Sequence, residues 1–151
     1  MAKSYIGNIP NTHVRDFQRK RLYEAEDACA FWKPLVFKFL TTKETKKLIK
    51  GISDWAEIPV PTLISNQGKV NMKQSIYATS DIISLPFPLS RTAPYIAHEM
   101  AHVVNYNSAK ADHHGPNFSK IYLQVVKEFI GIEAEQELQD SFNQNKVRYS
   151  T

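Results

Sequence analysis

The chain has 151 residues, of which 42% are hydrophobic and 23% charged, proportions that are ordinary for a soluble globular domain. Its net charge of +4 permits an acidic partner without requiring one. The single cysteine, Cys29, excludes a disulfide framework, and we find no apolar run of about 18 residues and no signal peptide. These features predict a cytoplasmic protein that does not contact a membrane.

One domain is expected to account for most of the chain. Residues 1–11 show no periodicity and are expected to form a flexible leader. Residues 12–142 are expected to form the domain, and residues 143–151 a polar tail.

Two amphipathic helices are predicted in the first half of the chain. The first covers residues 12–33, and Pro34 is expected to end it because the residue before a proline is pushed out of the helical region. The second covers residues 41–55. Thr41 and Glu44 have the spacing of a capping box at its start.

Short β-strands are predicted at residues 62–65, 73–79 and 81–85, with a turn at residues 66–68. An edge strand before the next helix would let an extended peptide add to the sheet, and residues 76–78 or 81–85 are the candidates. The alternative is that these strands only pack the core.

The next predicted helix carries His98, Glu99 and His102, and Thr92 and Pro94 suit its first turn. A spacing of four places both imidazoles on one helix face, where they can reach a single metal ion. Glu99 lies about 100° around the helix from His98 and can lean over the ion without binding it. Such a pattern is typical of zinc hydrolases, in which the carboxylate takes a proton from zinc-bound water. The alternative is an exposed helix with two unrelated histidines.

A catalytic zinc site needs a third protein ligand and one open position. Asn105 and Ser108 stand where one long-spaced zinc class has Gly and His, so that class is excluded. His114 is the preferred third ligand, because a turn follows it and leads into another helix. Asp112 is expected to accept a ring N–H from a ligand histidine. The remaining candidates for the third ligand are His113, Glu128 and Glu133.

The helix predicted to follow His114 runs from Pro116 to Gly131, where the glycine is its stop signal. Its apolar residues recur at helical spacing. We expect it to pack on the first helix and the sheet, with His114 fixed at its N-terminal end.

The sequences HEMAH at residues 98–102 and HGPNF at residues 114–118 resemble the SprT-like zinc metallopeptidases. Residues 15–19 and 23–26, which read RDFQR and YEAE, resemble the start of a family of metallohydrolases from actinobacteria and their phages. The likeness covers residues 14–131.

This resemblance implies an α+β, minimal zincin-like domain with a small, mostly antiparallel sheet packed on the HExxH helix and additional helices. It implies one catalytic Zn²⁺ held by His98, His102 and His114, with Glu99 as the catalyst. It supplies no substrate identity.

The function expected first is a zinc-dependent peptidase that acts on a polypeptide substrate, with Glu99 as general base. A further group should stabilise the oxyanion. The candidates, among which the sequence does not choose, are Tyr77, Arg91, Tyr95, Tyr106 and Tyr122.

Two other functions remain open. SprT-like relatives include proteases that act on DNA-bound proteins, and a basic cluster could contact nucleic acid or simply be a solvated helix face. Its members are Arg15, Arg19, Lys20 and Arg21. A zinc-stabilised interaction protein without turnover is the other possibility, and it would use His113 as a fourth ligand.

Overall fold

Helices dominate the computed structural model of the chain, which describes residues 16–30, 32–64, 76–86 and 90–151. The described helices are α2 (Arg19–Ala28), α3 (Trp32–Val36), α4 (Thr42–Ala56), α6 (Ala93–Tyr106), α7 (Pro116–Phe129) and α8 (Ile132–Gln144). The described strands are β1 (Thr62–Ile64), β2 (Tyr77–Ala78) and β3 (Ile82–Ser84). The fold is α+β, as predicted. None of the described helices is long and apolar enough to cross a membrane.

The small sheet is mixed, with the strand order β1-β3-β2. β1 pairs with β3 in parallel and β2 pairs with β3 antiparallel, so the prediction of a mostly antiparallel sheet is wrong. Alternation in a sequence indicates a strand but not its direction, which the connecting chain decides. The connection between β1 and β2 includes the predicted turn at residues 66–68 and the start of the strand predicted at 73–79, which lie outside the described residues.

The strand order also decides which strand can accept a peptide. β3 is the central strand and is paired on both sides, so residues 81–85 are not an edge. β2 lies at one end of the order and contacts α6. Of the two candidate edges, only the one at residues 76–78 fits this arrangement.

The helix predicted for residues 12–33 is instead two helices, α2 and α3. Its predicted start lies outside the described residues, but residues 16–18 are not helical and α2 begins at Arg19. Cys29 then adopts an extended conformation, with φ −79° and ψ 127°. Pro34 falls in the first turn of α3, where its missing N–H has no intrahelical partner to lose, so it does not end a helix as predicted.

The capping box predicted for α4 is confirmed. The Thr41 hydroxyl accepts the Glu44 backbone N–H at 3.0 Å, and the Thr41 backbone N–H donates to the Glu44 carboxylate at 2.9 Å. Both partners are exposed, so the motif orients the helix start rather than filling the core.

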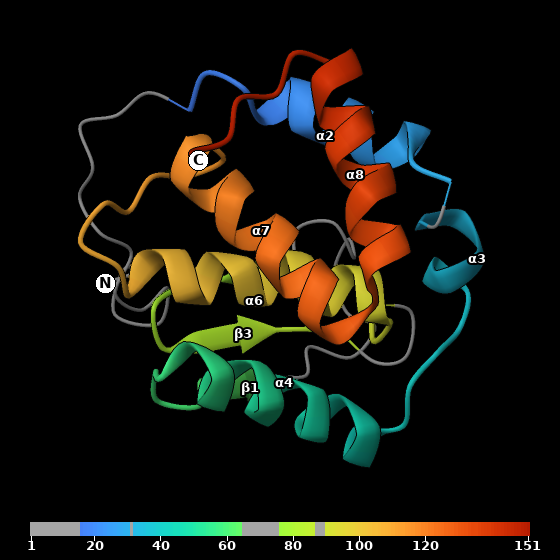
Figure 1. The fold of residues 1–151 in the computed structure, drawn as a ribbon. Coiled ribbons are helices and arrows are strands. Elements are labelled where there is room, and N and C mark those ends of the chain that lie inside the picture. Colours follow the sequence, from blue (N-terminus) through green and yellow to red (C-terminus); the bar gives the residue numbers. More distant parts are fainter. Residues whose placement is uncertain (1–15, 31, 65–75, 87–89) are drawn as a thin grey trace.

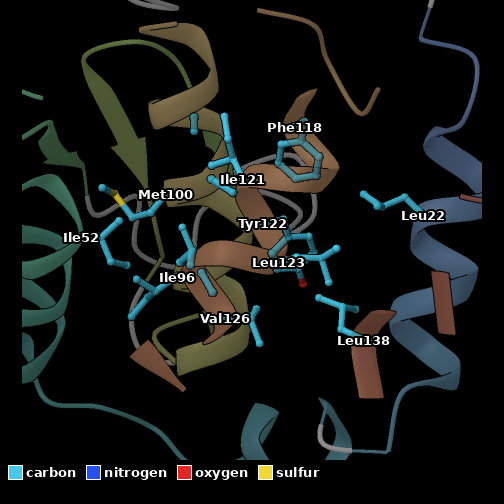
Figure 2. Packing of buried hydrophobic residues seen from close by; sticks show 14 of the residues in the cluster. Leu22, Ile52, Ile96, Met100, Phe118, Ile121, Tyr122, Leu123, Val126 and Leu138 are labelled. Carbon is cyan, nitrogen blue, oxygen red and sulfur yellow. The ribbon is translucent and has the colours of Figure 1, made fainter. Parts of the chain in front are cut away.

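The core is built around α6 and α7, which cross in contact with each other (Figure 1). α6 contacts β2, β3, α3 and α4, while α7 contacts α8 and α4. Figure 2 shows Tyr122 of α7 between Met100 of α6 and Leu138 of α8, and all three side chains are fully buried. The main neighbours of α7 are therefore α6 and α8, and not the first helix and the sheet as expected.

The last helix, α8, was not predicted. Its inner face is formed by Ala134, Leu138 and Phe142, which are buried, and α8 packs against both α2 and α7. Only two large apolar residues, Leu138 and Phe142, are buried among its thirteen residues, and the acidic residues around them make the stretch resemble a solvated segment. The final residues also contact the domain, since Val147 is buried and the Ser150 backbone N–H donates to the carbonyl of Pro116.

Asp112 stabilises the start of α7. Its carboxylate accepts the backbone N–H groups of Asn117 and Phe118 at 2.9 and 3.0 Å, rather than the ring N–H of a histidine as predicted. These donors belong to the first turn, which has no intrahelical acceptors for them. A Cβ at Gly115 would lie 2.5 Å from the Asp112 carboxylate, so this close approach requires glycine.

We predict that Asp112→Ala lowers the free energy of unfolding of the metal-free protein by about 1–2 kcal/mol, because two backbone donors lose their acceptor. Thermal unfolding in the presence of a chelator measures this loss as a decrease in Tm of about 3–6 °C. Asp140→Ala, which removes an exposed carboxylate from α8, is the control and should change stability by less than about 0.5 kcal/mol. An unchanged Tm for Asp112→Ala would contradict this role.

Candidate metal centre

Two of the predicted ligands lie on α6, one turn apart. The imidazole rings of His98 and His102 have their centroids 5.0 Å apart, and the residues are only 5% and 6% exposed. Thr92 is the N-cap residue and Pro94 lies in the first turn, as predicted, although the Thr92 hydroxyl makes no capping hydrogen bond. The histidine pair therefore faces the protein interior, which disagrees with the interpretation of two unrelated histidines on an exposed helix.

The turn between α6 and α7 brings His114 to the same place. Nε2 of His114 lies 3.1 Å from Nε2 of His102, and a ligand atom from each of His98, His102 and His114 lies within 4.8 Å of the other two. Two nitrogens bound to one tetrahedral zinc at 2.0–2.1 Å are about 3.3 Å apart. The His102–His114 pair already has this spacing, and the three imidazoles converge closely enough to hold a single ion.

The other candidates for the third ligand are placed elsewhere. Nδ1 of His113 lies 3.3 Å from the hydroxyl of Tyr106. Glu128 and Glu133 are exposed on α7 and α8. In the described part of the chain, the group able to hold a metal consists of the three histidines alone.

Glu26 sets the orientation of His98. One oxygen of its buried carboxylate, Oε2, lies 2.6 Å from Nδ1 of His98 and also accepts the hydroxyl of Tyr122 at 2.6 Å. With a proton held on Nδ1 by Glu26, Nε2 is the nitrogen of His98 left to ligate a metal. Burial opposes the charged ring, but the charge and hydrogen bond of Glu26 outweigh it and raise the pKa of His98 to about 9.

Asp16 has the same relation to His114. Its carboxylate lies 3.1 Å from Nδ1 of His114 and accepts the backbone N–H of that residue at 3.3 Å. Gln18 adds a hydrogen bond from its side-chain amide to the His114 carbonyl, at 2.8 Å. Burial lowers the pKa of His114 despite the hydrogen bond to Asp16, which keeps the ring neutral and able to ligate.

His102 is held by packing. Its ring stacks on Phe118, with centroids 4.2 Å apart, and on Tyr106, with centroids 5.6 Å apart. Its Nδ1 is buried and has no hydrogen-bond partner in the described part of the chain. Burial lowers the pKa of His102 well below its usual value, with further contributions from the other histidines. His102 is therefore a neutral imidazole close to two others, and a group of imidazole nitrogens is a donor set that suits zinc.

Glu99 lies beside this group without belonging to it. Its Oε2 is 3.8 Å from Nε2 of His98. Burial raises the pKa of Glu99 to about 7; the charge of His98 lowers it and the charge of Glu26 raises it. A carboxylate with this pKa can both accept and return a proton near neutral pH.

Tyr23 is a residue of the site that local sequence patterns did not single out. Its hydroxyl lies 3.4 Å from Nε2 of His114, and its ring stacks against His98 with centroids 6.0 Å apart. Tyr23 is 43% exposed, in contrast to the buried histidines. The available signal for these contacts was the resemblance of the segments RDFQR and YEAE to the metallohydrolase family. Those segments contain Asp16, Gln18, Tyr23 and Glu26.

The five residues considered for oxyanion stabilisation have other surroundings. Tyr122 donates to Glu26, Tyr106 is close to His113, and Tyr95 packs against Trp32. Arg91 donates to the Leu85 carbonyl and to Thr42, and Tyr77 lies in β2. The described contacts thus give Tyr106 and Tyr122 supporting positions around the centre.

The basic cluster is only partly available to a partner. Arg19 and Lys20 are exposed, whereas Arg21 donates to the Lys146 carbonyl and lies over the ring of Phe17. Arg15 lies outside the described residues.

Comparisons of the chain with protein-family models, curated proteins and solved structures gave no match. The likeness to SprT-like metallopeptidases and to actinobacterial and phage metallohydrolases therefore remains a resemblance of motifs.

Metal binding is predicted to release protons. In the metal-free protein His98 is protonated at pH 7, because its pKa is about 9, and a metal ligand must be neutral. We expect at least about one proton to be released per ion at pH 7, and the apparent affinity to rise about tenfold per pH unit until about pH 9. Calorimetry in buffers of different ionisation enthalpy measures the released protons. Metal affinity that is independent of pH between 7 and 9 would contradict the prediction that His98 must lose a proton to bind the metal.

Glu26→Gln tests the orienting hydrogen bond. We expect about a 10- to 100-fold loss of metal affinity at pH 9, where proton competition at His98 is small, and fewer protons released at pH 7. Glu24→Gln, an exposed carboxylate on the same helix, is the matched control and should bind as wild type. Competition with a chelator gives both affinities, and circular dichroism establishes that both variants are folded. Equal affinities at pH 9 would exclude the role of Glu26.

Proposed function

We propose that this protein is a zinc-dependent hydrolase of the metallopeptidase type, with His98, His102 and His114 as metal ligands and Glu99 as general base and acid. The observation that carries the proposal is the convergence of three buried imidazoles next to a buried carboxylate whose pKa is raised to about 7. The motif resemblance supports the same assignment.

Each residue has a role that follows from its position. A divalent ion at the three imidazoles would supply Lewis acidity and lower the pKa of a bound water to about 7. Glu99 accepts a proton from the water that attacks the carbonyl carbon, and then donates it to the leaving nitrogen. Glu26 and Asp16 hold the rings of His98 and His114 in the tautomer that presents Nε2.

The donor set favours a catalytic centre over a purely structural one. Structural zinc sites close with a fourth protein ligand, which the third candidate function assigned to His113. Within the described residues the metal-binding group has three members, and His113 is not one of them. A structural centre would also have no use for Glu99.

A polypeptide substrate is supported by the sheet. β2 is at one end of the strand order and contacts the helix that carries two ligands, so an extended peptide could pair with it. DNA association has weaker support, because Arg21 of the basic cluster is already engaged with the C-terminal segment.

The deciding experiment compares Glu99→Gln with His102→Ala. Glu99→Gln should retain the metal and lose about 100-fold or more of kcat, since the proton acceptor is gone. His102→Ala should lose the metal. Metal analysis and cleavage of a library of quenched fluorescent peptides measure the two properties.

Glu128→Gln, an exposed carboxylate on α7, is the control and should cleave and bind metal as wild type. Turnover at the wild-type rate by Glu99→Gln would refute the mechanism. Metal retained by His102→Ala would refute the ligand assignment.

A further inference from the structure

Among the tyrosines in the described residues, Tyr23 places its hydroxyl 3.4 Å from a candidate ligand nitrogen, Nε2 of His114. We infer that Tyr23 is a catalytic residue that donates a hydrogen bond to the substrate carbonyl oxygen as that oxygen becomes negatively charged. The inference rests on the hydrolase function proposed above and adds the oxyanion-stabilising group that such a reaction needs.

The distance from Tyr23 to His114 places the hydroxyl beside the candidate metal centre. It lies 3.4 Å from one ligand nitrogen, so a substrate bound at the centre would come within reach of a hydrogen bond from Tyr23. Its ring is held against two ligand rings, stacked on His98 and edge-on to His114, so the position is defined by packing.

Metal binding would free this hydroxyl for a new partner. If Asp16 holds the proton on Nδ1 of His114, the lone pair of Nε2 can accept a hydrogen bond from Tyr23 at 3.4 Å, and the same nitrogen lies 3.1 Å from Nε2 of His102. When Nε2 ligates an ion, the same lone pair is used for the metal bond. The Tyr23 hydroxyl then has no acceptor on His114 and is available to the oxygen of a substrate beside it.

Other tyrosines near the centre are less suited. The hydroxyl of Tyr122 is buried and donates to Glu26, and that of Tyr106 lies near His113. Tyr23 is 43% exposed, so a substrate arriving from solvent can reach it. Tyr23 also comes from α2, a different element from those that carry the histidines.

The proposed step conserves atoms and charge. The water oxygen bonds to the acyl carbon while Glu99 takes its proton, and the carbonyl π electrons move to the oxygen, which receives the hydrogen bond from Tyr23. The electrons return as the carbon–nitrogen bond breaks, and the nitrogen takes the proton from Glu99. Tyr23 keeps its own proton throughout, so the net reaction adds one water to the amide.

Tyr23→Phe in the metal-loaded, full-length protein tests this role. We expect kcat on quenched fluorescent peptides to fall about 100-fold with KM changed less than about threefold, because the lost hydrogen bond forms mainly in the transition state. Metal content should equal that of wild type. Tyr95→Phe is the matched control, because it removes a tyrosine hydroxyl from a ring that packs on Trp32, and it should retain wild-type kcat.

A second measurement does not depend on turnover. Inorganic phosphate presents tetrahedral anionic oxygens, and its binding to the Co²⁺-loaded protein can be followed by visible absorption. We expect Tyr23→Phe to raise the phosphate Kd about tenfold or more, as the loss of a hydrogen bond to an anion predicts. Tyr95→Phe should leave this Kd unchanged.

These measurements separate the two proposals. Peptide cleavage by Tyr23→Phe at the wild-type rate overturns the role of Tyr23 and leaves the hydrolase function standing. Wild-type protein that binds metal without cleaving any peptide overturns the hydrolase function. A weaker phosphate affinity in Tyr23→Phe would then still support the Tyr23 hydroxyl as a hydrogen-bond donor to an anion at the metal. Loss of metal from Tyr23→Phe overturns the inference, because it would make Tyr23 a determinant of metal binding.

Discussion

The hydrogen bond between Glu26 and His98 joins α2 to α6, the helix that carries the metal-binding motif. It is buried at both ends, spans 72 positions of sequence, and shares its acceptor oxygen with Tyr122 of α7. Three helices thus meet at one carboxylate oxygen. Because an unpaired carboxylate in this position would carry a large desolvation cost, the arrangement of α2, α6 and α7 and the orientation of His98 depend on one another.

The site could be predicted from sequence wherever the chemistry is local. His98, Glu99 and His102 follow from helical periodicity, and His114 from the turn that precedes a strongly amphipathic helix. Asp16, Tyr23 and Glu26 could not be found in this way. Their role depends on which helix packs beside α6. A local pattern does not distinguish a carboxylate on the exposed face of α2 from one on its buried face. Asp112 illustrates the converse, since its position in sequence suggested a histidine partner and its actual partners are backbone N–H groups.

The fold shows a similar division. The capping box of α4 and the termination of α7 at Gly131 depend on a few adjacent residues, and both were predictable. The strand direction in the sheet, the division between α2 and α3 and the packing of α8 depend on distant parts of the chain. Pro34 is instructive, because the same residue can end one helix or begin another, and only the path of the chain before it decides.

Gln18 has a consequence for how the centre is assembled. Its side-chain amide nitrogen donates to the carbonyls of His114 and Arg148, and its side-chain oxygen accepts the Arg148 backbone N–H. The first and last described segments are therefore hydrogen-bonded to each other through Gln18, next to the backbone of the candidate ligand His114. Contacts so remote in sequence form late and slowly in folding. A chain that stops after α7 would have all three imidazoles but would lack the Arg148 backbone groups that hold the Gln18 amide in place, so we expect it to bind an ion less tightly.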